Sequence, residues 1–116
     1  MHLQLKGKIE INAPADKVWQ VIAHNYGDIG QWAVMIPASS AITDIPALDG
    51  APVAGRVCSA QGFGDVREQF TYYDEQAKRF GYIAVEGLPS FMSRAENNWS
   101  VRSLGPEKSE VAMRGR

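Results

Sequence analysis

The stretch that most constrains the fold is residues 11–36, INAPADKVWQVIAHNYGDIGQWAVMI. Its apolar residues recur at helical spacing in two groups. The groups are Ala15, Val18, Trp19 and Ile22, and then Ile29, Trp32, Ala33 and Ile36. Pro14 suits the first turn of a helix, and Pro37 ends one. The stretch therefore predicts two short amphipathic helices joined by a turn at residues 25–27, with Trp19 in the core and His24 at a helix end.

The segments on either side of these helices have the period of β-strands. Residues 3–11 alternate between apolar and polar side chains, as expected of a strand with one buried face. Six further strands are predicted after Pro37, separated by turns rich in Gly and Pro. They span residues 39–45, 53–60, 66–74, 79–86, 93–104 and 108–114. Strands joined by short turns pair antiparallel, so the order predicts a curved sheet of about seven strands with the helices plugging one end.

Length and charge exclude several classes of partner. The chain has 116 residues, which is about one domain, and a formal net charge of -1. No basic stripe stands out, which argues against nucleic acid as a partner. No apolar run approaches the roughly 20 residues that a membrane helix needs, and the first residues do not resemble a secretory signal. We therefore expect a cytoplasmic protein without membrane insertion.

The sequence lacks the usual catalytic and metal-binding motifs. Cys58 is the single cysteine, so an internal disulfide cannot form, and we interpret it as a buried strand residue. No His and carboxylate cluster has metal-ligand spacing. Residues 62–64, GFG, are interpreted as a hairpin turn rather than a phosphate loop. We expect no metal and no cofactor.

Motifs spread over nearly the whole chain resemble one known family. They include IEINAP at 9–14, VW at 18–19, GDI at 27–29, GRV at 55–57, VRE at 66–68, RFGY at 79–82, GLP at 87–89 and SEV at 109–111. In this order they resemble the START/Bet v1-like (SRPBCC) superfamily, and within it the bacterial polyketide cyclase/dehydrase-like group. The resemblance implies a single α+β domain over residues 1–116 with a helix-grip fold.

The family fold wraps a seven-stranded sheet around a long C-terminal helix, with a cavity between them. This sequence stops at Arg116, about where the seventh strand ends, so that helix is missing from the chain. The sheet would then present an open apolar face. Either the natural polypeptide continues, or a second copy of the chain covers the face as a homodimer.

Strand alternation predicts which side chains line the cavity. Asn97 and Trp99 share a face of their strand, and Glu68 shares one with Phe70 and Tyr72, although one bulge would put Arg67 there instead. The predicted ligand-binding residues are Trp32, Met35, Phe70, Tyr72, Tyr82, Asn97 and Trp99. Glu68 is the candidate general acid or base. The alternative is that the aromatic residues fill a core and that Glu68 is a surface carboxylate paired with a neighbouring arginine.

Three functions fit these features. The first is binding of a small hydrophobic or aromatic molecule, polyketide-like or lipid-like, as in lipid transport. The second is a polyketide cyclase or dehydrase that holds its substrate in a productive fold and moves protons with Glu68, Tyr82 or Asn97. The third is an interaction module whose open sheet dimerises. The lack of an acid–base pair favours the first.

Overall fold

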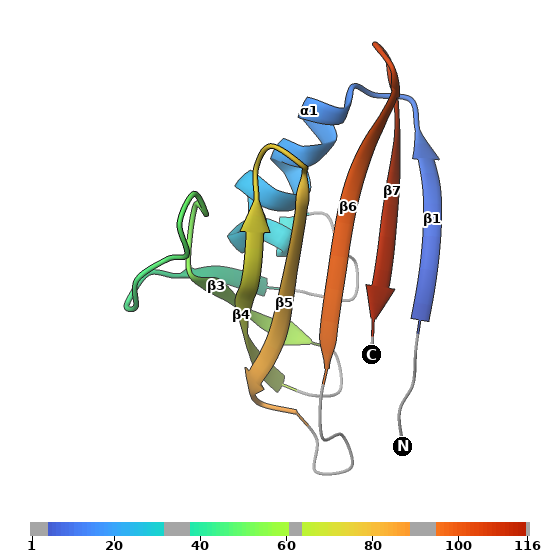
Figure 1. The fold of residues 1–116 in the computed structure, drawn as a ribbon. Helices are drawn as coiled ribbons and strands as arrows, with labels where there is room; N and C mark the ends of the chain where they lie inside the picture. The colour runs from blue at the N-terminus through green and yellow to red at the C-terminus, as the bar shows by residue number, and fades with distance from the viewer. Residues whose placement is uncertain (1–4, 32–37, 61–63, 89–94, 116) are drawn as a thin grey trace.

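The computed structural model describes residues 5–31, 38–60, 64–88 and 95–115 as a single seven-stranded antiparallel sheet with helical segments against one end (Figure 1). The strand order is β1-β7-β6-β5-β4-β3-β2, so the first strand lies beside the last. The strands are β1 (Leu5–Ile11), β2 (Ala38–Ile42), β3 (Gly55–Ala60), β4 (Gly64–Asp74), β5 (Arg79–Glu86), β6 (Glu96–Gly105) and β7 (Lys108–Gly115). The predicted α+β fold is confirmed.

The helical stretch is more irregular than two α-helices. It comprises α1 (Ala15–Trp19), the π-helical turn η1 (Gln20–His24) and the 3₁₀ segment η2 (Tyr26–Gln31). Trp19 is only 1% exposed and Ala23 is fully buried, which confirms Trp19 as a core residue. His24 ends η1, as expected from its position in the sequence. Trp32 and Met35 lie outside the described residues.

A β-bulge in β4 decides which of its aromatic side chains face the helices. Phe70 pairs with Tyr82 on β5, and the register then shifts so that Tyr72 pairs with Gly81 and Tyr73 with Phe80. Phe70 and Tyr73 therefore share the inner face, which packs against the helices, and Tyr72 lies on the outer face. The prediction that Phe70 and Tyr72 share a face was wrong, because strict alternation does not account for the extra residue.

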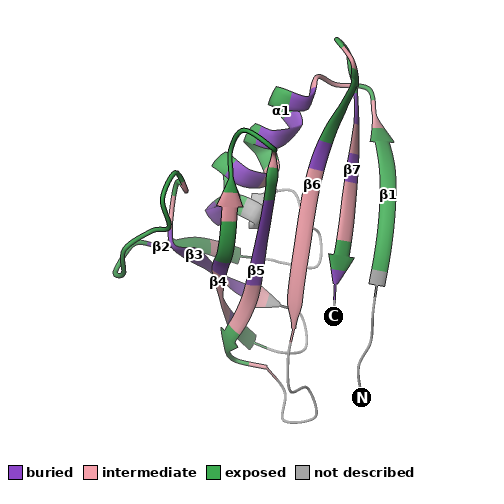
Figure 2. Ribbon diagram, viewed as in Figure 1, coloured by how far each residue is buried: buried purple, intermediate pink, exposed green. Residues whose placement is uncertain are grey.

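The core forms where the helices cover the inner face. The ring centroids of Trp19 and Phe80 are 5.7 Å apart, and those of Tyr26 and Phe70 are 4.2 Å apart. Figure 2 shows buried residues along the helical segments and β5, whereas most of β1 is exposed. Cys58 is buried in β3, as predicted.

The β4–β5 turn holds the helices in place through Glu75. Its carboxylate accepts hydrogen bonds from Trp19 Nε1 and from the Tyr73 hydroxyl, each at 2.9 Å, and lies 2.9 Å from His24 Nε2. Lys78 in the same turn forms an ion pair with Asp16 of α1 at 3.0 Å. These contacts hold α1 and η1 against one end of the inner face, which is therefore covered.

Candidate functional site

The inner face contains a buried ion pair. Arg56 on β3 lies opposite Glu68 on β4, and its Nε donates to Glu68 Oε1 at 2.7 Å. The Arg56 side chain is 5% exposed and that of Glu68 is 16% exposed. A second guanidinium nitrogen, Nη1, donates to the backbone carbonyl of Tyr26 at 3.3 Å. The pair therefore connects two strands of the sheet to η2.

Two tyrosine rings enclose the guanidinium group. The Cζ atom of Arg56 lies 4.0 Å from the ring centroid of Tyr26 and 4.7 Å from that of Tyr82, both within cation–π range. Burial raises the pKa of Tyr82, although the charge of Arg56 opposes that rise. Burial also raises the pKa of Tyr26, and its hydroxyl has no hydrogen-bond partner among the described residues. Both phenols therefore remain neutral at physiological pH.

Cys58 belongs to the same cluster, and its burial disfavours the reactive thiolate form. Its Sγ lies 3.7 Å from Glu68 Oε1. Burial raises the pKa of the thiol to about 11, which leaves very little thiolate at neutral pH. Since the thiolate is the reactive form, Cys58 serves as a packing residue here.

Beyond this cluster, toward β6, β7 and β1, the inner face is less covered. Trp99 is half-buried, stacks on Phe80 at a centroid distance of 6.5 Å, and lies opposite Met113 on β7. Asn97 lies opposite Gly115, where a Cβ atom would come within 2.6 Å of Asn97 Oδ1. At the sheet edge Ile9 is 62% exposed. The side chains form an aromatic and apolar surface with one amide.

The predicted site residues separate into three groups. Asn97 and Trp99 lie on the uncovered part of the inner face, and Glu68 faces inward as predicted. Phe70 and Tyr82 are each 6% exposed and pack in the core against Tyr26, so for these two the core interpretation holds. Tyr72 lies on the outer face, away from the others.

Arg56 and Tyr26 are not among the residues predicted for the site. Arg56 shares the inward phase of β3 with Cys58, so a charged residue in the apolar phase of a strand was a detectable sign. Its pairing with Glu68 depends on strand register, which alternation does not reveal. Tyr26 lies in the turn between the two predicted helices and carried no sign of its role.

Two kinds of feature are absent from the part of the chain that the structure describes. Within it, no three His, Cys, Asp or Glu side chains gather closely enough to hold a metal ion. No helix in the same ranges is long and apolar enough to cross a membrane.

A seven-stranded antiparallel sheet with helical segments between its first two strands defines a START/Bet v1-like fold. The chain belongs to the polyketide cyclase/dehydrase and lipid transport family, whose model matches residues 2–116. A search of curated proteins gives no match.

Solved structures share this fold at low sequence identity. The protein XoxI from Bacillus cereus superposes with a TM-score of 0.79 at 16% identity, covering 99% of this chain and 75% of that one. A START superfamily protein from Mycobacterium smegmatis gives 0.75 at 14% identity, with 97% and 74% covered. Norcoclaurine synthase from Thalictrum flavum, solved with a transition-state analogue, gives 0.72 at 14% identity, with 97% and 73% covered.

Proposed function

We propose that the protein binds a small hydrophobic or aromatic molecule, polyketide-like or lipid-like, on the inner face of the sheet. The observation that carries the proposal is the uncovered aromatic surface around Trp99, next to a buried polar cluster. Family membership and fold support a ligand-binding role of this kind. A mostly apolar surface with few polar groups is typical of small-molecule sites.

The apolar part of the surface consists of residues from three neighbouring strands. Trp99 and Met113 lie opposite each other on β6 and β7, and Met113 lies opposite Gly7 on β1. The missing side chain at Gly7 leaves space at the edge, since a Cβ atom there would meet nothing within 4 Å. A flat ligand can therefore lie against the Trp99 ring and extend toward Ile9.

Three polar groups lie in or beneath this surface. Asn97 lies opposite Tyr82 on β5, and both belong to the inner face. The Trp99 indole N–H makes no hydrogen bond of good geometry with a described residue. Its interaction with the Tyr82 hydroxyl lowers the pKa of Tyr82, but burial raises that pKa by more. Tyr82 and the Trp99 N–H are buried, so the Asn97 amide is the group that can orient a ligand through its oxygen atoms.

Fluorescence titration with the neutral probe N-phenyl-1-naphthylamine tests the proposal. The wild type should bind the probe, and Trp99→Ala should weaken binding about tenfold, since truncating a central aromatic contact costs more than about 1.4 kcal/mol. Ile9→Ser, at a position that is 62% exposed, should also weaken binding. Val85→Ser is the matched control, because Val85 is 45% exposed and lies outside this surface.

Equal affinity of the wild type, Trp99→Ala and Ile9→Ser for the probe would overturn the proposal. Native mass spectrometry of the purified protein adds a second readout. It would show any retained small molecule and whether two chains associate.

The second candidate is a cyclase or dehydrase that uses Glu68, Tyr82 and Asn97. The position of Glu68 on the inner face, beside the buried Arg56, favours it. One Glu68 oxygen already accepts from Arg56, so proton transfer would fall to the other oxygen. Given a reactive polyketide chain, Glu68→Gln should abolish turnover and keep probe binding, since the amide oxygen of Gln can still accept from Arg56. Unchanged turnover would exclude Glu68 as the acid or base.

A further inference from the structure

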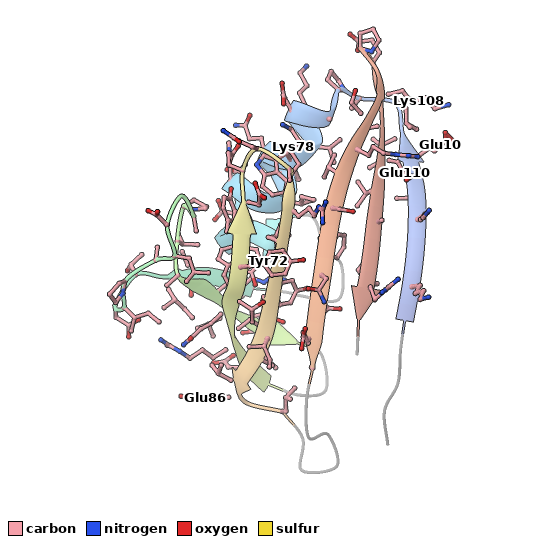
Figure 3. The ribbon with its side chains drawn as sticks, in the orientation of Figure 1. Glu10, Tyr72, Lys78, Glu86, Lys108 and Glu110 are labelled. Carbon is pink, nitrogen blue, oxygen red and sulfur yellow. The ribbon has the colours of Figure 1, made fainter. Side chains whose placement is uncertain are left out.

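The outer face of the sheet has a hollow of its own, about 690 Å³ in volume. It lies across β1, β7, β6, β5 and β4, on the side away from the helices. Tyr72, labelled in Figure 3, stands beside it. The other polar and charged residues that line it include Lys6, Lys8, Arg79, Asn98 and Arg114.

The hollow exists because small residues lie between long ones. One row across the sheet runs from Lys6 through Arg114, Asn98 and Gly81 to Tyr72. The Tyr72 ring lies over Gly81, where a Cβ atom would come within 2.5 Å of Tyr72 Cε1 and 2.7 Å of Asn98 Oδ1. The bulge that turns Tyr72 outward therefore also supplies an aromatic wall.

In the next row, Lys8 lies opposite Ala112, Ala112 opposite Ser100, and Ser100 opposite Arg79. Ala112 and Ser100 form a low floor between two cationic side chains. The hollow is thus bounded by cations on both sides and by an aromatic ring at one end.

The charge of the hollow is unbalanced. Four cations and one carboxylate, Glu96, line it, which gives a net charge of +3 on a protein whose formal net charge is -1. Lys6 lies directly opposite Arg114, and like charges in that arrangement destabilise a sheet. None of the four cations forms an ion pair with a carboxylate of the described residues.

The other end of the same face is arranged differently. Lys108 forms an ion pair with Glu10 at 3.2 Å, and Arg102 with Glu110 at 3.3 Å. Glu10, Lys108 and Glu110 are grouped together in Figure 3, apart from Tyr72. Ion-paired charges at one end, and at the other end cations around a hollow that pair with no carboxylate of the described residues, indicate a site for an anion.

We propose that this hollow binds a soluble small molecule that carries phosphate groups and an aromatic ring. The phosphates lie among Lys6, Lys8 and Arg114, which donate charge-assisted hydrogen bonds. The ring lies against Tyr72, and Asn98 supplies an amide for its polar edge. The lining of the hollow also includes Gly7, Trp99 and Met113, which belong to the proposed hydrophobic site on the inner face. The variants that test the outer site are therefore made at Lys6, Arg114 and Tyr72, which belong to the hollow alone.

Titration of the ¹⁵N-labelled protein with ADP and, separately, with pyrophosphate tests this assignment by NMR. ADP should shift the amide resonances around Tyr72, Asn98 and Arg114. Lys6→Gln and Arg114→Gln should each weaken the binding of ADP and of pyrophosphate about tenfold, because each substitution removes a charge-assisted contact. Tyr72→Leu should weaken the binding of ADP and leave the affinity for pyrophosphate unchanged, since only ADP has an aromatic ring.

The matched control is Arg102→Gln, which removes an outer-face cation that already has a carboxylate partner. It should leave both affinities within about twofold. Equal weakening by Arg102→Gln and Arg114→Gln would overturn the proposal, because the attraction would then be unspecific. Binding to vesicles of phosphatidylglycerol without binding to ADP or pyrophosphate would also overturn it, since the site would then recognise a lipid surface.

Discussion

Arg56 and Glu68 face each other across β3 and β4, with 2.7 Å between Arg56 Nε and Glu68 Oε1. The guanidinium group lies between the rings of Tyr26 and Tyr82. Little water reaches either charge, so each depends on the other for compensation. The pair is therefore buried in the part of the inner face that the helical segments cover.

Removing one member of the pair should be strongly destabilising. Arg56→Met leaves Glu68 with an uncompensated carboxylate, and we expect it to lower the free energy of unfolding by about 3 kcal/mol. Urea denaturation followed by circular dichroism measures this loss. The double variant Arg56→Met with Glu68→Leu should regain most of it, because no buried charge remains. A double variant no more stable than the single one would contradict this account.

Phe70 and Tyr72 should differ sharply in their contribution to stability. Phe70→Ala removes a ring that is 6% exposed and packs on Tyr26, Tyr73 and Phe80, so we expect a loss of about 3–5 kcal/mol. Tyr72 is 39% exposed, and Tyr72→Ala should cost less than about 1 kcal/mol. The same urea experiment compares the two. Equal losses would contradict the β-bulge between them.

Glu75 should make stability depend on acidic pH. Burial acts to raise its pKa, but hydrogen bonds from Trp19, His24 and Tyr73 outweigh burial and lower it. A carboxyl with a lowered pKa stabilises the fold above its unfolded pKa, about 4.3, and this contribution is lost as the pH falls through the folded value.

We therefore expect the wild type to lose more stability than Glu75→Gln between about pH 6 and pH 3. Urea midpoints measured in steps over this range provide the comparison. Glu107→Gln, in the exposed β6–β7 turn, is the control and should follow the wild type. If the urea midpoints of the wild type and Glu75→Gln changed with pH in the same way, the Glu75 carboxylate would not contribute to stability as described.

Two strand glycines should respond oppositely to alanine. A Cβ atom at Gly55 would clash with the backbone carbonyl oxygen of Glu68, so Gly55→Ala should cost about 2–3 kcal/mol. A Cβ atom at Gly7 would meet nothing within 4 Å, and Gly7→Ala should be neutral or slightly stabilising. Thermal unfolding of both variants distinguishes them. A neutral Gly55→Ala would mean that β3 and β4 separate without cost.

Local patterns in the sequence predict the elements well. The seven strands and the helical insertion were predicted from periodicity and from Gly and Pro, because these signals depend only on neighbouring residues. Residues 79–86 were predicted as a strand and coincide with β5, whereas residues 39–45 end three residues beyond β2. The irregular π and 3₁₀ turns after α1 have no comparable periodic signature.

The candidate site was less predictable. Trp99 and Asn97 were assigned to the inner face by alternation alone, since β6 is regular around them. Alternation assigned Tyr72 to the wrong face, because the bulge in β4 adds one residue between Phe70 and Tyr73. Such a bulge depends on how β4 and β5 pair, which the sequence of β4 does not specify.

The sequence by itself determined the order of elements, the inward phase of Glu68, Asn97 and Trp99, and the fold class. Only the tertiary structure decided that Arg56 is the partner of Glu68, that Phe70 and Tyr82 are covered by the helices, and that Tyr72 stands over a basic hollow. The physical reason is the range of the interactions involved. Periodicity acts within a few residues, whereas register, bulges and helix docking join residues far apart in the chain.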